Sequence, residues 1–169
     1  GNENIVYIKI RGVVDEGAAL DVDAGSGLVV MGGHYSVNDD LPWLVDEIKL
    51  IHRALEKDIP MMGVCFGAQL ISKALGAEVS KSQYMEAGWH TIEADTSMLA
   101  DVHALNLDDS FEVFEWHGDT FSMHNGAIPL FIARNLENQG YVYGKVLAMQ
   151  FSMEVTEHMV HEWLKRYRV

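Results

Sequence analysis

The only cysteine of the chain lies in a segment whose composition suits a catalytic nucleophile. Cys65 follows an apolar run, Ile59 to Val64, and glycines stand two residues before and after it, at Gly63 and Gly67. Such glycines allow a sharp strand-to-helix turn, the arrangement called a nucleophile elbow. The N-terminus of the following helix would favour the thiolate, and the next backbone N–H could hold an oxyanion. The alternative interpretation is a buried core cysteine, which is frequent for a lone thiol.

The elements around this turn are those of an α/β fold. Short apolar runs at 28–31 and 59–64 predict buried strands. Between them, apolar residues spaced four, three and four apart over 44–55 predict an amphipathic helix, started by an acidic cap at 39–40 and by Pro42. A short helix follows the cysteine. This alternation predicts a parallel sheet with helices on both faces, and the thiol would lie at its carboxyl edge, where open α/β folds bind ligands.

The remaining elements are predicted by apolar alternation and by turn residues. The end of the chain returns to strands and a helix, whereas the middle carries short strands separated by turns. We expect strands over 5–10, 89–93, 111–116 and 130–133, a hairpin over 141–151 around Gly144–Lys145, and a last helix over 156–166 with Met159, Val160, Trp163 and Leu164 on its inner side.

Length and charge narrow the classes of function. The chain has 169 residues, which predicts one domain over 1–169. There are 25 acidic and 12 basic residues, a formal net charge of −13, which argues against binding nucleic acid or an anionic membrane. We find no apolar run long enough to span a bilayer and no signal peptide. A single cysteine fits a reducing compartment, so we expect a cytoplasmic protein.

The cysteine turn resembles the active-site turn of the class I glutamine amidotransferases, whose pattern is G-x-C-x-G-x-Q, with Gln69 at the last position. Other segments resemble pieces of that family in the same order along residues 27–163. They are Gly27–Gly33, Leu75–Val79, the E-x-G-W segment Glu86–Trp89, the H-G-D segment Trp116–Phe121, Asn138–Gln139 and Gln150–Glu154. The H-G-D segment resembles the corresponding segment in the free-standing, GMP-synthetase-like branch of the family. The resemblance implies a three-layer, flavodoxin-like, mostly parallel sheet with a small antiparallel extension.

The resemblance also implies a reaction and its residues. In that family a cysteine thiolate attacks the side-chain amide of glutamine, a histidine transfers the proton and a glutamate orients the histidine. Hydrolysis of the thioester gives glutamate, and the ammonia passes to a synthetase. Carried over by position, Cys65 is the nucleophile and Glu154 the orienting acid. The residues implied for glutamine binding are Gly32, Gly33, Phe66, Gln69, Glu86, His117, Gly118 and Asp119, with oxyanion N–H groups from Gly33 and Phe66.

The chain departs from the family at the general base. The histidine of Q-F-H-x-E is replaced by Ser152 in Gln150-Phe151-Ser152-Met153-Glu154. A serine hydroxyl is no base near neutral pH, and loss of a triad member costs several orders of magnitude in rate. Three explanations stay open: a pseudoenzyme that keeps the glutamine pocket, a histidine replaced deliberately, or a substitute base. His34, after the two glycines of the oxyanion loop, is the best substitute, although a solvent-facing loop residue is the plainer interpretation.

A second departure concerns the front of the chain. Only about 26 residues precede Gly27, fewer than the strand, helix and strand with which relatives begin. We therefore expect either a shortened N-terminal unit, which leaves a sheet edge or an apolar face bare, or a sequence from which segments of the natural chain are absent. A bare edge or a bare apolar face predicts self-association into a homo-oligomer, or low stability.

Cofactors and partners complete the expectations. His117 and Asp119 have no third ligand placed with them, so we predict no metal site and no cofactor. Glutamine is the expected ligand, and a separate synthetase would accept the ammonia. Two other functions stay open: a non-catalytic glutamine-binding or scaffold domain, and a cysteine hydrolase of the same fold acting on another γ-glutamyl bond.

Overall fold

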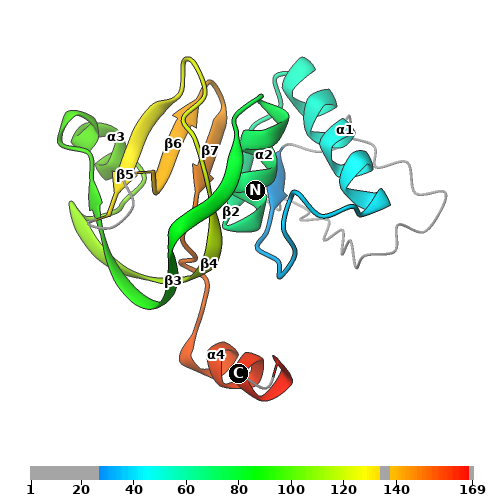
Figure 1. Ribbon diagram of the computed structural model, residues 1–169. Helices are drawn as coiled ribbons and strands as arrows, with labels where there is room; N and C mark the ends of the chain where they lie inside the picture. Colours follow the sequence, from blue (N-terminus) through cyan, green and yellow to red (C-terminus); the bar gives the residue numbers. More distant parts are fainter. Residues whose placement is uncertain (1–26, 134–137, 168–169) are drawn as a thin grey trace, which may run out of the picture.

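The elements of the chain alternate between strands and helices in the first half and become mainly strands in the second (Figure 1). The computed structural model describes residues 27–133 and 138–167; the predicted strand over 5–10 and the expected shortened N-terminal unit lie outside them. In chain order the elements are β1 (Leu28–Val30), α1 (Pro42–Glu56), β2 (Met61–Val64), α2 (Phe66–Ala74), β3 (Val79–Ala94), the 3₁₀ helix η2 (Thr96–Met98), α3 (Leu99–Ala104), β4 (Ser110–Phe121), β5 (Ile128–Ile132), β6 (Gly140–Tyr143), β7 (Val146–Met149) and α4 (Glu157–Tyr167).

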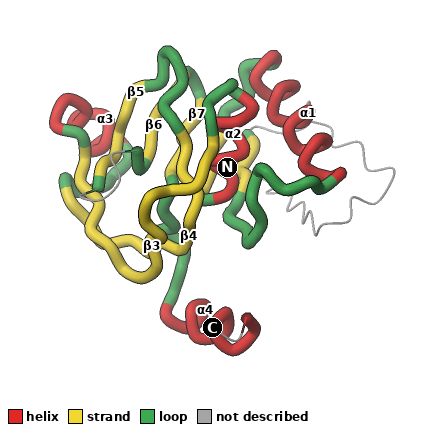
Figure 2. The backbone as a smooth tube through the Cα atoms, in the orientation of Figure 1, coloured by secondary structure: helices red, strands yellow, loops and turns green. Residues whose placement is uncertain are grey.

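The described strands form one sheet with a parallel and an antiparallel part. Their order is β1-β2-β7-β6-β5-β3-β4. β1, β2 and β7 run parallel, whereas each neighbouring pair from β7 to β4 is antiparallel. Helix α2 packs on the parallel strands, and α1 packs on α2 (Figure 2). The predicted α/β fold class is confirmed, as is the antiparallel hairpin of β6 and β7.

Strands β3 and β4 are longer than the sequence predicts. The expected short strands over 89–93 and 111–116 lie within strands of 16 and 12 residues that pair along most of their length. The register shifts between Lys81 and Glu86, which marks a bulge or irregularity in the pairing. Residues 79–88 lack a clean apolar alternation, so their strand structure follows from pairing with β4 and not from a local pattern.

Helix α1 begins at Pro42, as predicted, but its cap differs from the prediction. The N-cap residue is Leu41, which makes no side-chain capping hydrogen bond. The Asp39 carboxylate instead accepts a hydrogen bond from the backbone N–H of Ser36, at 2.9 Å, in the turn before the helix. The predicted acidic cap is therefore wrong. Proline itself explains the start, since its fixed φ suits the first helical turn and its missing N–H needs no partner there.

Two glycines allow α2 to lie directly against the strands. A methyl group added at Gly67 would lie 1.9 Å from the backbone oxygen of Val30, and one at Gly63 would lie 2.8 Å from the backbone of Ala68. Both distances are far below van der Waals contact. The glycines beside Cys65 are thus required by the close approach of β1, β2 and α2, which fixes where α2 begins.

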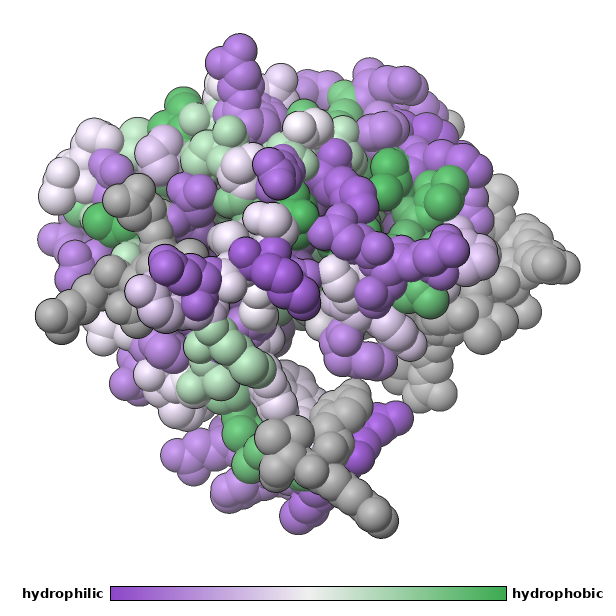
Figure 3. Space-filling view, viewed as in Figure 1, coloured by the Kyte–Doolittle hydropathy of each residue, from purple (hydrophilic) through white to green (hydrophobic). Residues whose placement is uncertain are grey.

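The core is divided between the two parts of the sheet. One buried apolar cluster joins α1 and α2 to the parallel strands, and a second joins α3 to β3, β4 and β5. The face of β1 and β2 that points away from α2 is exposed to solvent among the described residues. Val29 and Met62, which pair in register there, are 57% and 37% exposed. Hydrophilic side chains cover much of the face shown in Figure 3. No helix in the described ranges is long and apolar enough to cross a membrane.

Helix α4 lies apart from the helices of the first half, at the end of an extended connection from β7 (Figure 1). Of the four residues expected on its inner side, Met159, Val160 and Trp163 are half-buried, whereas Leu164 is 40% exposed. The Trp163 ring contacts the rings of Phe114 and Trp116 on β4, with centroids 6.2 and 6.1 Å apart. An aromatic contact thus brings α4 beside β4.

Candidate active site

Cys65 occupies the sharp turn between β2 and α2 that its flanking glycines predict. Its backbone has φ 51° and ψ −112°, in the left-handed half of conformational space that residues with a side chain rarely adopt. The turn is held by a hydrogen bond of 2.8 Å from the Cys65 N–H to the carbonyl of Met149 on β7, and by the first helical bond, from the Gln69 N–H to the carbonyl of Cys65. Cys65 is half-buried: it lines a cavity and also packs against the second apolar cluster.

A cavity of about 610 Å³ opens beside this turn. That volume suits a small ligand such as an amino acid. The cavity lies at the carboxyl ends of β1 and β2, where open α/β sheets bind ligands. Eleven of the twelve residues predicted for the site line it: Gly32, Gly33, His34, Cys65, Phe66, Gln69, His117, Gly118, Asp119, Ser152 and Glu154. The exception is Glu86, which lies behind His117.

The segment after β1 lies over the cysteine turn. A methyl group built on Gly32 would lie 3.5 Å from Cβ of Cys65, and one built on Gly33 would lie 3.7 Å from the ring of Phe66. The two glycines therefore bring their backbone close to Cys65 and Phe66 without a side chain in between. The backbone N–H of Phe66 stabilises negative charge on the sulfur. These are the two backbone segments from which oxyanion donors are predicted.

The thiol of Cys65 is strongly held in its protonated form. Burial is the main cause that raises its pKa to about 12; the Phe66 N–H acts in the opposite direction, and the carboxylates of Glu115 and Glu154 make smaller contributions that also raise it. A reactive cysteine needs the reverse, a nearby cation or base that favours the thiolate. The elbow geometry of a nucleophile is thus present without the electrostatics that activate one.

Ser152, which the sequence resemblance predicts to stand at the position of the family's base, lies on the cavity wall. Its backbone pairs with Phe114 of β4, through hydrogen bonds of 2.9 Å (Ser152 N–H to Phe114 carbonyl) and 3.1 Å (Phe114 N–H to Ser152 carbonyl). The position of residue 152 is therefore fixed by the sheet and not by its side chain. Glu154 also lines the cavity, with its side chain exposed to solvent.

Two histidines line the cavity, and their surroundings differ. His34 is exposed on the loop after β1, with its ring 4.1 Å from that of Tyr35, centroid to centroid. Its role as a substitute base stays a prediction. His117 is buried, and both ring nitrogens are engaged: Nδ1 donates to the backbone carbonyl of Asp119 at 2.9 Å, and Nε2 faces two carboxylates. An imidazole with no free nitrogen cannot accept the thiol proton.

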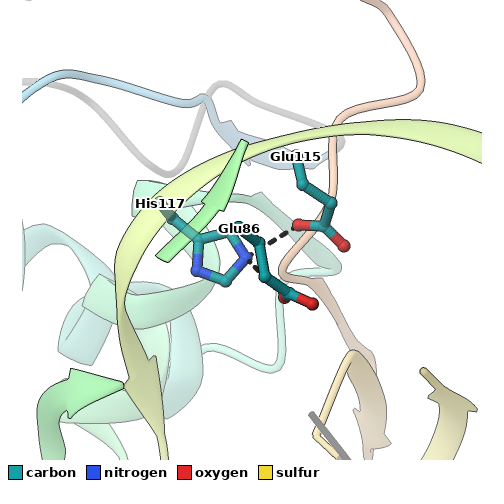
Figure 4. Close-up of side chains that lie close together, drawn as sticks. All are labelled: Glu86, Glu115 and His117. Carbon is teal, nitrogen blue, oxygen red and sulfur yellow. Dashed lines mark hydrogen bonds and ion pairs between the residues drawn. The ribbon is translucent and has the colours of Figure 1, made fainter. Parts of the chain in front are cut away.

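The carboxylates around His117 come from both long strands (Figure 4). Nε2 lies 2.7 Å from Glu115 and 3.3 Å from Glu86, and all three residues are buried. Burial opposes protonation of His117, but its hydrogen bonds to Glu115 and Glu86 outweigh this effect and raise its pKa to about 9. Sequence reasoning missed Glu115. The signal was present, because residues 115, 117 and 119 alternate on one buried face of β4.

Polar contacts connect the cavity wall to the sheet behind it. The Gln69 side-chain amide donates to the Asp119 carbonyl at 3.0 Å and to Oε1 of Gln150 at 3.2 Å. The Asp119 carboxylate accepts from the Ser36 hydroxyl at 2.6 Å and lies 3.0 Å from Nζ of Lys81. Burial works against its charge, but these two partners outweigh it and hold the pKa of Asp119 below the usual value. Ser36 and Lys81 had no sequence signal.

Known proteins share this arrangement of sequence and structure. The chain is 33% identical over 101 residues to a glutamine amidotransferase-like protein of Acanthamoeba polyphaga mimivirus, covering 57% of this chain and 49% of that protein. It is 29% identical over 175 residues to the glutamine-hydrolyzing GMP synthase of Oleidesulfovibrio alaskensis, covering 94% of this chain and 31% of the synthase. The chain thus spans about half of the first relative and under a third of the second.

Solved structures and a family model agree with these relatives. The crystal structure of a glutamine amidotransferase from Methylobacillus flagellatus superposes with a TM-score of 0.80 at 37% identity, over 88% of this chain and 60% of that one. The crystal structure of a glutamine amidotransferase from Thermotoga maritima superposes with a TM-score of 0.75 at 34% identity, over 87% of this chain and 64% of that one. These neighbours confirm the predicted flavodoxin-like fold. The family model for glutamine amidotransferase class-I matches residues 4–163. With a family match over nearly its whole length, this chain belongs to the class I glutamine amidotransferases, as its cysteine turn predicts.

Proposed function

We propose that the domain binds glutamine in the cavity beside Cys65 and hydrolyses its side-chain amide through a thioester, at a rate limited by the missing base. The observation that carries this proposal is the elbow itself. Cys65 has a positive φ at the start of α2, with Gly32, Gly33 and the Phe66 N–H beside it in one cavity. That arrangement suits attack of a thiolate on a carbonyl and the holding of the resulting oxyanion.

The chemistry would proceed in two steps. In the first, the Cys65 sulfur bonds to the amide carbon, the oxyanion collapses, and ammonia leaves after gaining a proton. In the second, water attacks the thioester and releases glutamate and the free thiol. Both steps need a group that takes and returns a proton. Ser152 cannot do so, and burial keeps the thiol pKa at about 12, so we infer that formation of the thioester is slow.

Two further parts of the proposal follow from relatives. The GMP synthase of Oleidesulfovibrio alaskensis is named as glutamine-hydrolyzing and is much longer than the part matched here. We infer that ammonia released by this domain is destined for a synthetase unit. A cytoplasmic location is also part of the proposal, because free glutamine and reduced thiols are found together there.

Binding of glutamine is the first test. Titration calorimetry with glutamine would show a single site on the parent protein. Gly118 lines the cavity, and a Cβ added there meets nothing within 4 Å. Gly118→Leu should therefore fill the cavity without disturbing the core and weaken glutamine binding at least about tenfold, whereas Gly118→Ala should weaken it less. Absence of glutamine binding to the folded parent would refute the proposal. Turnover undetectable despite tight binding would favour the non-catalytic glutamine-binding alternative.

A further inference from the structure

Behind the cavity wall, three buried side chains bring their ligand atoms together. Glu86 comes from β3, and Glu115 and His117 come from β4 (Figure 4). One ligand atom of each lies within 4.8 Å of the other two. The 3.3 Å from Nε2 of His117 to Glu86 matches the spacing of about 3.3 Å between ligands of a tetrahedral zinc ion, whereas the 2.7 Å to Glu115 is a hydrogen-bond distance that would lengthen by about 0.6 Å on binding.

The charges of the cluster do not balance with protons on the imidazole alone. Two carboxylates face one imidazole, so this buried group is neutral only when it holds two protons beyond the neutral imidazole, at least one of them on a carboxyl group, or a divalent cation. A buried charge without a counter-charge is costly. A divalent cation bound to two carboxylates and a neutral imidazole would give a neutral cluster.

Two oxygen atoms at the cluster have no hydrogen-bond partner. Oε1 of Glu115 and Oε1 of Gln139 are buried and unpaired among the described residues, although both side chains are at most 1% exposed. Gln139 belongs to the cluster, since its amide donates to Glu86 at 2.9 Å. Buried acceptors of this kind normally have a partner. A cation bound by the cluster would provide a partner for Oε1 of Glu115.

The orientation of the His117 ring suits a metal ligand. Nδ1 must carry a proton, because it contacts the backbone carbonyl of Asp119, which can only accept. A histidine that binds metal through Nε2 usually donates its other N–H to a carbonyl or carboxylate in this way. Nε2, which faces the carboxylates, therefore needs either a second proton or a metal ion.

We propose that Glu86, Glu115 and His117 form a binding site for one divalent transition-metal ion, of which Zn²⁺ is the best match. Three protein ligands, one nitrogen and two oxygens, fit the coordination that zinc shares with a fourth ligand such as water. Mg²⁺ and Ca²⁺ prefer six or more oxygen ligands and retain waters, which a buried cluster of three side chains does not supply. The ion would join β3 to β4 directly behind the cavity.

Zinc binding to the full chain tests the proposal. After treatment with a chelator, the protein would be titrated with Zn²⁺ in competition with a chromophoric chelator, and with Mg²⁺ in parallel. We expect one tight zinc site and no magnesium site. Glu115→Gln keeps the shape of the side chain but removes its charge, so zinc affinity should fall more than the 10–100-fold typical for loss of a residue that only supports a ligand. The melting temperature should rise with zinc in the parent and not in this variant.

Two controls separate this site from other zinc ligands. Cys65→Ser removes the only thiol, and His103→Gln removes the exposed histidine that pairs with Asp109. Both should bind zinc as the parent does. Co²⁺ bound to the parent should show no thiolate charge-transfer band, a result that needs no variant to fold. Absence of a tight site, tight binding by folded Glu115→Gln, loss of binding in Cys65→Ser, or a thiolate band would each overturn the proposal.

Discussion

The protonated state of the Cys65 thiol leads to a prediction that needs no assumption about substrate. Burial raises its pKa from a reference of 9.0 to about 12. At pH 8 such a thiol is about one part in ten thousand thiolate, against about one part in ten for the reference thiol. Since the thiolate is the nucleophile, alkylation of the folded chain should be about a thousandfold slower than that of the unfolded chain.

Alkylation by iodoacetamide, followed by intact mass, measures this directly, because the chain has one cysteine. The logarithm of the rate should rise by about one for each pH unit and reach no plateau up to pH 10, with circular dichroism confirming that the protein stays folded. A purely steric block would lower the whole profile and leave the plateau near pH 9. A plateau at or below pH 10 in the folded protein, including the plateau near pH 9 of a steric block, would refute the reasoning.

A pair of variants tests the electrostatic part of the shift. The carboxylate of Glu154 raises the thiol pKa, so Glu154→Gln should lower it and speed alkylation at pH 8 by about two- to fivefold, a modest effect because exposed charges are screened. Glu157→Gln, in the first turn of α4, is the matched control and should change nothing. Equal effects of the two variants would contradict the assigned role of Glu154.

Three further predictions concern stability and the pocket. Gly67→Ala should prevent stable folding or cost at least about 3 kcal/mol in denaturant unfolding, because its methyl group would overlap the backbone of β1; a loss under 1 kcal/mol would contradict this. Tyr141→Phe should cost about 1 kcal/mol, since it removes the buried 2.9 Å hydrogen bond with Ser72; an unchanged urea midpoint would count against it. Gln69→Leu should weaken glutamine binding in calorimetry at least tenfold, because Gln69 lines the cavity and holds the wall at Asp119; unchanged affinity would exclude that role.

The turn at Cys65 could be predicted from sequence, because a short local pattern of residues specifies it. The turn at Cys65 and its glycines follow from close backbone approach, which only glycine allows, so their spacing alone indicates the geometry. The same holds for Pro42 at the start of α1. Segments in the family's order then placed Ser152 and Glu154 beside the cysteine, and both line the cavity.

The parts that depend on pairing between distant segments could not be predicted in this way. The full length of β3 and the nearness of Glu86 to Glu115 both come from the β3–β4 register, which no local pattern in residues 79–88 announces. The N-cap of α1 is another example. Leu41 occupies it because the Asp39 carboxylate accepts a hydrogen bond from the Ser36 N–H in the preceding turn. Such competition between nearby acceptors is decided by tertiary structure.

The central claim is tested most directly by measuring glutamate release from glutamine. Three proteins would be compared: the parent, Ser152→His, and the double variant that combines Ser152→His with Cys65→Ala. The backbone at residue 152 is fixed by its pairing with Phe114, so an imidazole there would have the family's position beside Cys65. We predict that Ser152→His releases glutamate at least about a hundredfold faster than the parent, within the range for general acid–base catalysis, and that the double variant is silent. A parent as fast as Ser152→His, or a folded, glutamine-binding Ser152→His that stays silent, would contradict the account.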